Sequence, residues 1–562
     1  MQYKYNISTI LLTALFSILL ISCKNQNNKP ENSNNEPEVE IVDNRTIKDR
    51  VNEYIKVSLT ADVSTLSDKE KSMIKLLIHA ADIINDIFWE QAYGDKNELF
   101  NSISDEDTLS LVKINIGPWD RFDDFKPIGE RFGKKPIGAN LYAKDVKYLQ
   151  FVDMKFEDKF SAFTIIRRAE DGSLYTIPYH KAYAEKLQKI SELVKEAAAL
   201  SDNEDFKKYL NLRAEALLTD NYYESEIAWM DIKDNKVDFL FGPYEDQEDR
   251  FLNIKSAFES YLLIKDKEWS DKLERFISLL PELQKSLPVD EKYKQEVPGK
   301  DSDIGVYDAI YYSGYSNAGG KSISINRPLD GRVQLEKGNR KLQFKNVMKL
   351  KFEKILTPIS DLLISENQRK HIKFDAFFQN SMCYEIGEGL GVKFTVNGSK
   401  QSVKDALKEL YNIMHVGKAE VLRIFIATKL YELGEIKDGE LTDNYVTFMA
   451  NIFRSVRFGA GHAQGQANMI VFNYFQETGA FNRDDATGTY SVNVDKMKEA
   501  VSKLADKIIS IQGNGDYRAA KALVDEKGTI KETLQKDLNR IAEAGIPKDI
   551  IFDQGAAVLG LE

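Results

Sequence analysis

The sequence predicts an α+β protein with a mixed α/β lobe at residues 46–335 and a mainly helical lobe at residues 336–562. Two observations predict this division. Before about residue 335, runs with the two-residue period of strands alternate with helical segments; after it, the 3.6-residue period of amphipathic helices dominates. A third observation narrows the architecture: the sequence shows no repeat of solenoid length, which argues against a repeat protein.

The first strong element is a helix that starts after Ser67. Ser67 and Glu70 have the spacing of a capping box, and Leu66 is placed to act as a hydrophobic staple. Apolar residues then recur on one face of the helix, at Met73, Ile74, Leu77, Ala81, Ile84 and Phe88.

A β-hairpin is expected next, because strand-like runs at 163–168 and 174–178 flank Asp171-Gly172. Two amphipathic helices follow, at about 182–199 and 203–218. The remaining strand-like runs of the first lobe are at 236–241, 304–312 and 321–326.

Composition limits the class of protein. The chain has 562 residues, of which 43% are hydrophobic and 29% charged, as in ordinary soluble globular proteins. The net charge of -11 would repel a phosphate backbone, so we expect no nucleic-acid partner. With two cysteines, and no two of the five histidines three to five residues apart, no local segment offers a disulfide framework or a histidine pair for a metal.

The amino end is typical of an exported protein. Residues 1–22 combine Lys4 with an apolar stretch too short to span a membrane stably, which predicts a signal peptide. The stretch ends in Leu20-Ile21-Ser22-Cys23, which resembles the lipobox of bacterial lipoproteins. That resemblance implies a leader cut before an acylated Cys23, and therefore a stable lipid anchor. An uncleaved anchor or a chance cysteine is the alternative.

Residues 24–45 are rich in Asn, Glu and Pro, so we expect a disordered tether between a membrane and the folded body. The expected location is the bacterial cell envelope. Lys24, where an Asp would signal retention in some bacteria, favours the outer over the inner membrane.

Several separated stretches resemble the bacterial branch of the dipeptidyl peptidase III family, and their order and spacing strengthen the match. They are Gly117-Pro-Trp-Asp-Arg121, Arg213-Ala-Glu-Ala-Leu-Leu-Thr-Asp220 with Ala228-Trp-Met-Asp231, Phe374-Asp-Ala-Phe-Phe378 with Gly389-Leu-Gly391, and Phe453-Arg-Ser-Val-Arg-Phe458. The resemblance implies two lobes around a cleft and a zinc exopeptidase that removes dipeptides from the amino end of peptides. Some relatives carry a Nudix domain, but this sequence has no Nudix box.

The zinc motif of that family is altered. In the family, one helix reads His-Glu-x-x-His, sometimes with one residue inserted, and a second helix supplies a glutamate ligand. Here the histidine positions hold Tyr384 and Glu388, or Gly389 in the longer form, and the glutamate position holds Val416. The family's general base, Glu385, remains. Since valine cannot bind zinc, we expect no cofactor in this chain, in contrast to the zinc of the family.

Two interpretations of the altered motif stay open. Glu385, Glu388, His415 and Glu420 would form a rebuilt site for a harder ion. Alternatively, the same groups form a metal-free polar cluster, in which the Tyr384 hydroxyl donates to Glu388 and a protonated His415 pairs with Glu388 or Glu385.

The family's peptide-binding positions are partly kept. The resemblance places the acid that holds the substrate's amino group at Glu245, and the first asparagine of the substrate loop at Asn326. The histidine that acts in the transition state falls on Gln464, with His462 displaced by two residues.

Three functions follow as hypotheses. The first is a lipid-tethered pseudopeptidase that binds a peptide or a protein without cleaving it. The second is an active metallohydrolase with a remodelled metal site. The third is a structural protein of the cell envelope.

Overall fold

The computed structural model describes residues 45–298, 302–398 and 401–562. Within this range, Thr46–Glu562 forms one compact unit. The predicted signal peptide, Cys23 and all of the tether except Arg45 lie outside the described residues. Lipid anchoring therefore stays a prediction. No helix among the described residues has the length and apolar character that crossing a membrane would require.

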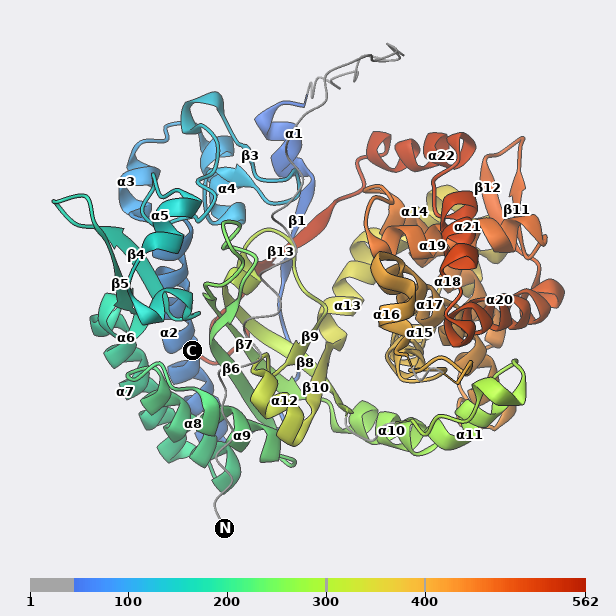
Figure 1. The fold of residues 1–562 in the computed structure, drawn as a ribbon, viewed down its shortest axis with the longest axis horizontal. Helices are drawn as coiled ribbons and strands as arrows, with labels where there is room; N and C mark the ends of the chain where they lie inside the picture. The colour runs from blue at the N-terminus through green and yellow to red at the C-terminus, as the bar shows by residue number, and fades with distance from the viewer. Residues whose placement is uncertain (1–44, 299–301, 399–400) are drawn as a thin grey trace, which may run out of the picture. The chain divides into compact units, whose positions relative to one another are not determined.

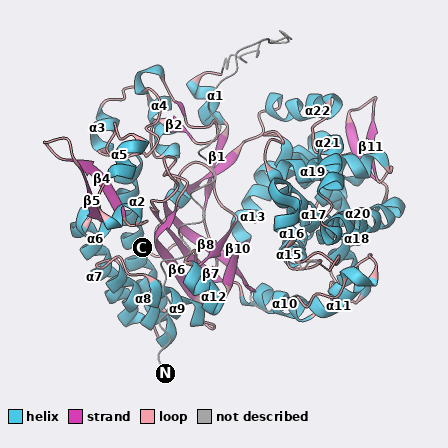
Figure 2. Ribbon diagram, in the orientation of Figure 1, coloured by secondary structure: helices cyan, strands magenta, loops and turns pink. Residues whose placement is uncertain are grey.

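A five-stranded sheet lies at the centre of the first lobe (Figures 1 and 2). Its strand order is β6-β7-β8-β10-β9, and β10 runs parallel to β8 while the other neighbours are antiparallel. Nearly every side chain of β6 and β7 is buried, which fits strands covered on both faces. The strands are β6 (Val237–Glu245), β7 (Ala257–Lys265), β8 (Ser302–Gly314), β9 (Ser324–Arg327) and β10 (Asn339–Phe344).

The long helix α2 (Asp68–Ala92) packs against β7 and β8. Its predicted capping box is confirmed: the Ser67 hydroxyl accepts from the Glu70 amide at 3.2 Å, and the Glu70 carboxylate accepts from the Ser67 amide at 2.7 Å. The predicted apolar face is buried along its whole length. The amphipathic pattern of the sequence therefore places this helix correctly on the sheet.

The predicted hairpin is also confirmed. Strands β4 (Thr164–Arg168) and β5 (Leu174–Pro178) pair antiparallel. In the turn, the Asp171 carboxylate accepts from the Ser173 amide at 2.9 Å, and Gly172 has a φ of 84°. The two helices predicted after the hairpin are α7 (Ala184–Leu200) and α8 (Glu204–Ala216).

Short helices and one small strand pair complete the first lobe. They are α1 (Ile47–Asn52), α3 (Lys96–Asn101), α4 (Glu106–Asn115), β2 (Trp119–Asp120), β3 (Lys126–Pro127), α5 (Tyr148–Asp153), α6 (Tyr179–Ala182), α9 (Tyr223–Asp231) and α12 (Gly331–Lys337).

The second lobe is built around α15 (Phe374–Glu388) and α17 (Tyr411–Glu432), which pack against each other. Helix α17 is buried on almost all sides from Ile413 to Leu430, with α18, α19 and α20 against it. The other elements are α13 (Lys345–Lys351), α14 (Thr357–Leu363), α16 (Val403–Leu407), α18 (Leu441–Val456), α19 (Ala463–Glu477), β11 (Phe481–Asp484), β12 (Thr489–Val492), α20 (Val494–Asn514), α21 (Tyr517–Lys527) and α22 (Glu532–Glu543).

The chain passes between the lobes more than once. Helices α10 (Lys267–Ser278) and α11 (Leu280–Ser286) precede β8 in the sequence, yet the Gln284 side chain hydrogen-bonds the Gly391 backbone at 3.1 and 2.9 Å. The last strand, β13 (Asp549–Asp553), returns to pair in parallel with β1 (Tyr54–Ser58). The α+β fold class is confirmed. Strand β10 follows residue 335 but belongs to the five-stranded sheet, so we count residues 339–344 with the first lobe. The boundary at residue 335 itself stays a prediction.

Candidate functional site

Two packed helices carry the altered motif. Tyr384, Glu385 and Glu388 lie in the last turns of α15, and α17 carries His415, Val416 and Glu420 near its start. Residues three apart on a helix share a face, so Glu385 and Glu388 point to the same side of α15. The chemistry of the site depends on the groups that lie opposite these two carboxylates.

A lysine from the sheet of the first lobe contacts both of them. The Lys341 ammonium on β10 lies 2.8 Å from a Glu385 carboxylate oxygen and also contacts the Glu388 carboxylate directly. Gln343, two residues along the same strand, donates to the other Glu385 oxygen at 3.1 Å. The three charged side chains are mostly buried, at 15–28% exposure. A cation of the protein itself therefore bridges this carboxylate pair and offsets part of its negative charge.

Sequence reasoning missed Lys341 and Gln343. The available signal was weak: both are polar and lie two residues apart, which puts them on one face of a strand otherwise rich in buried residues. Nothing in the strand itself indicates which helix it faces.

The charged groups of this cluster shift one another's pKa values. Burial by itself would lower the pKa of Lys341, but Coulombic attraction from Glu385 and Glu388 raises that pKa overall. Burial raises the pKa of Glu385, against the opposing pull of Lys341. Lysine in this position therefore stays protonated at neutral pH.

In one of the two interpretations left open, a protonated His415 pairs with the glutamates. Burial, followed by repulsion from Lys418, lowers the pKa of His415 to about 4, so its imidazole is neutral at pH 7. Its Nε2 lies 4.0 Å from Glu388, and its ring stacks on Tyr411. The positive charge next to Glu385 and Glu388 comes from Lys341.

Tyr384 takes part in a different interaction from the one expected. Instead of engaging Glu388, its ring lies under the Arg423 guanidinium, 4.6 Å from the ring centre. Arg423 also donates to Glu420 at 2.7 Å, and Gln464 donates to the same Glu420 oxygen at 2.6 Å. The residue at the family's transition-state histidine position thus binds a buried carboxylate, while His462 caps the start of α19.

Lys418 completes the cluster. Its ammonium donates to the Glu388 backbone carbonyl at 2.9 Å and to the Leu390 carbonyl, which satisfies the end of α15. Lys341 therefore serves Glu385 and Glu388, Arg423 serves Glu420, and Lys418 binds backbone carbonyls. Cys383 is buried beside them with a pKa raised by burial to about 12, so it is not a nucleophile.

Glu245 lies at the end of β6, at the edge of a hollow of about 630 Å³. Arg121, Gln247, Arg250 and Tyr315 line the same hollow. Burial and repulsion from Glu259 raise the pKa of Glu245 to about 7. The carboxylate is partly accessible to solvent.

Asn326 lies beside the altered motif. On β9 it is exposed, and it pairs directly with Lys341 across the antiparallel β9–β10 ladder. Directly opposed residues point to the same face of a sheet. The next residue, Arg327, contacts the Glu259 carboxylate and lies over the Tyr244 ring, beside Glu245. The strands thus place the predicted substrate-loop residue beside Lys341, which contacts the predicted general base.

Comparisons with known proteins show the family and the fold. A model of peptidase family M49 matches residues 167–418. The solved structure of DPP III from Caldithrix abyssi is 35% identical, with 91% of this chain and 99% of that chain covered and a TM-score of 0.85. The chain belongs to the dipeptidyl peptidase III family. The dipeptidyl-peptidase III of Corallococcus sp. strain EGB is 31% identical, covering 92% and 98% of the two chains, with a TM-score of 0.73.

The chain is also similar to a longer plant protein. The Arabidopsis thaliana protein described as Nudix hydrolase 3 is 31% identical over 569 residues, covering 90% of this chain and 73% of that protein. The two-lobed α+β fold expected from the resemblance is confirmed by these relatives.

The zinc of the dipeptidyl peptidase III family does not fit the residues of this chain. Of the three ligand positions, Tyr384 packs under a guanidinium, Glu388 contacts an ammonium and Val416 has no donor atom. A zinc ion would lie next to the Lys341 charge and lack histidine ligands. No step of a reaction can therefore be assigned to zinc at this position.

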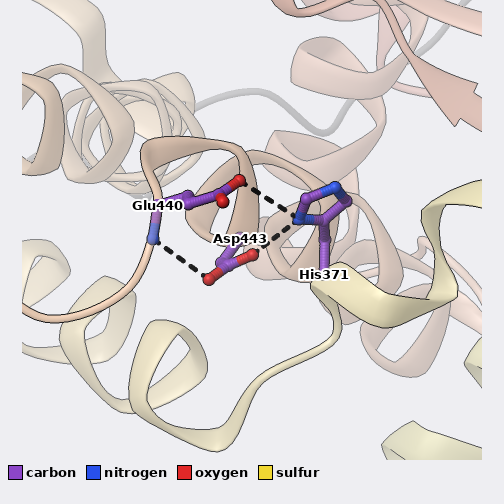
Figure 3. Close-up of side chains that lie close together, drawn as sticks. All are labelled: His371, Glu440 and Asp443. Atoms are coloured by element: carbon purple, nitrogen blue, oxygen red, sulfur yellow. Dashed lines mark hydrogen bonds and ion pairs between the residues drawn. The ribbon is translucent and has the colours of Figure 1, made fainter.

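One other group of side chains has a spacing suited to a metal. Among the residues that the structure describes, ligand atoms of His371, Glu440 and Asp443 lie within 4.8 Å of one another (Figure 3). A helix cap explains this group: Asp443 accepts from the Glu440 amide at 3.1 Å and contacts the His371 ring at 2.7 Å. The Glu440 side chain is 73% exposed, as expected for a solvated helix start.

Proposed function

We propose that this chain is a lipid-anchored, non-catalytic member of the dipeptidyl peptidase III family, which binds a peptide or a protein segment at the bacterial cell envelope. Cys23 would carry the lipid. Replacing Cys23 with serine should then move the protein from the membrane fraction to the soluble fraction, and a variant that stays in the membrane fraction would exclude this anchor.

One observation carries the proposal: the Lys341 ammonium binds Glu385 and Glu388, where the family's motif provides a base and a metal ligand. A general base alone contributes a factor of roughly 10²–10⁴. Amide hydrolysis requires far more than that. Moreover, the retained base is engaged by a cation and an amide.

Accessible residues support binding. Asn326 is exposed and Glu245 is partly exposed in its hollow, so both could reach a ligand. These features favour the binding hypothesis over a purely structural envelope protein, for which we would expect buried positions. A metallohydrolase with a remodelled site is the second candidate, because Glu385, Glu388 and His415 do lie close together.

The direct test is a dipeptidyl-naphthylamide assay on protein lacking residues 1–23, purified without chelator and with zinc added. We expect no release above that of the Glu385→Gln variant, which lacks the family's base. Turnover that depends on zinc and disappears in Glu385→Gln would refute the proposal. Stoichiometric metal in elemental analysis would favour the remodelled hydrolase.

Peptide binding should depend on pH through Glu245. Its pKa of about 7 means that the carboxylate gains its charge as the pH rises from 6 to 8. A peptide's α-amino group has a pKa of about 7.7–8.0, so it is still largely protonated at pH 7.5. We therefore expect affinity for a short peptide to rise roughly fivefold from pH 6 to pH 7.5 and to fall again at higher pH, measured by fluorescence polarisation.

Two controls make this pH test specific. The Glu245→Gln variant should bind weakly at every pH, whereas Glu204→Gln, on an exposed helix start, should bind like the native protein. An N-acetylated peptide should lose the pH dependence. An unchanged profile in Glu245→Gln would exclude Glu245 as the amine-binding acid.

A further inference from the structure

The position of Lys341 is more specific than that of an ordinary surface ion pair. Its ammonium is shared by two carboxylates of the same helix face, and the lysine side chain is 16% exposed. Gln343 donates to the remaining Glu385 oxygen, so three of the four carboxylate oxygens have close partners on β10, namely Lys341 and Gln343. The fourth, on Glu388, faces the neutral His415 at 4.0 Å.

This arrangement has the connectivity of a small cation site. Two carboxylates converge on one positive centre, and an uncharged imidazole stands at the side. Carboxylate and imidazole groups are also ligands for ions such as Mn²⁺. A divalent ion on the same oxygens would lie only a few ångströms from the ammonium, and the repulsion between like charges would oppose its binding.

We propose that Lys341 is the resident cation of this centre: it takes the electrostatic place of a metal ion, and it keeps divalent ions out by holding Glu385 and Glu388. This inference does not depend on whether the protein binds peptides. It concerns the native carboxylate pair and accounts for why those acids persist without a metal ligand set, since buried carboxylates need a partner.

The same contacts also connect the central sheet to a helix of the second lobe. Lys341 and Gln343 belong to the central sheet, whereas Glu385 and Glu388 belong to a helix of the second lobe. The cation therefore joins the two lobes where β10 faces α15. A metal ion bound only by helices of the second lobe would not make that connection.

The test is removal of the lysine charge with little change of shape, in Lys341→Met. Titration with Mn²⁺, followed by loss of the free-ion electron paramagnetic resonance signal, should show at least tenfold tighter binding than in the native protein. Mn²⁺ should also raise the melting temperature of Lys341→Met but leave that of the native chain unchanged.

Three further variants show whether the gain in Mn²⁺ binding comes from removal of the lysine charge or from a general disturbance of the fold. Lys341→Arg keeps a positive charge and should not gain Mn²⁺ binding. Lys341→Met with Glu388→Gln should lose the gain, because only one carboxylate remains. Lys345→Met is the matched control: Lys345 contacts a single carboxylate, Asp266, and its removal should create no ion site.

Two outcomes would overturn the inference. One is tight Mn²⁺ or Zn²⁺ binding by the native protein that Glu385→Gln abolishes, since the lysine would then not exclude ions. The other is a folded Lys341→Met protein whose Mn²⁺ affinity equals that of Lys341→Arg. Even if Lys341→Met fails to fold, the role of Lys341 can be tested through the triple variant that adds Glu385→Gln and Glu388→Gln. This variant leaves no unpaired charge at the centre, so it should fold. Its failure to fold would also contradict the proposed role.

Discussion

Replacing Tyr384 with histidine, Glu388 with histidine and Val416 with glutamate is expected to give a chain that binds about one zinc ion per molecule. The three positions lie on the packed helices α15 and α17, and 384 and 388 are one turn apart on one face. Two imidazoles and a carboxylate make a zinc ligand set that leaves a fourth position open. Elemental analysis after gel filtration measures the result.

Lys341 should limit this rebuilt site. Adding Lys341→Met to the three changes removes a positive charge next to the ion, and we expect at least a tenfold gain in zinc affinity, about 1.4 kcal/mol. Lys345→Met on the same background is the control and should give no gain. If the triple variant folds but retains no zinc, the two helices do not hold the altered positions in a ligating arrangement, and our account of the motif is wrong.

Removing Glu248 is expected to destabilise the fold by roughly 3–5 kcal/mol, because it leaves two buried cations without the carboxylate that balances their charge. The Glu248 carboxylate is fully buried and binds Arg121 at 2.7 Å and Lys135 at 2.5 Å. Urea unfolding of Glu248→Ala at pH 7 measures the loss. Glu204→Ala, which breaks an exposed ion pair, should change stability by less than about 0.5 kcal/mol.

The same carboxylate predicts a pH dependence of stability. Burial would raise its pKa, but Arg121 and Lys135 lower the pKa of Glu248 to about 2. Since this pKa lies below the value of about 4.3 in an unfolded chain, the stabilisation is present above pH 4.3 and is lost as the pH falls towards 2. The loss is on the order of 3 kcal/mol and should be absent in Glu248→Gln. An equal acid sensitivity in that variant would contradict the assignment.

Local patterns in the sequence predicted local structure well. The capping box at Ser67, the hairpin at Asp171-Gly172 and the paired helices at 184–200 and 204–216 follow from interactions between residues close in the chain. The family resemblance supplied what such patterns cannot, namely that α15 and α17 face each other at the altered motif.

The content of the site was predicted less well, for a physical reason. Whether His415 carries a charge depends first on burial, which the local sequence does not reveal, and only then on Lys418, three residues further along the same helix. The partner of Glu385 and Glu388 is 44–47 residues away, on a strand of another lobe. Only the three-dimensional arrangement of β10 and α15 reveals that Lys341 faces these acids.

The pairing of β1 with β13 has a consequence for how the protein is made. Tyr54 aligns with Asp549, and Asp549 also binds Lys351 at 2.7 Å, so the last strand fastens the first. Closing so long a stretch of chain costs entropy and delays folding. While the chain folds, β1 therefore stays an unpaired edge until residues 549–553 are available, and a chain cut short before them would leave that edge open to aggregation.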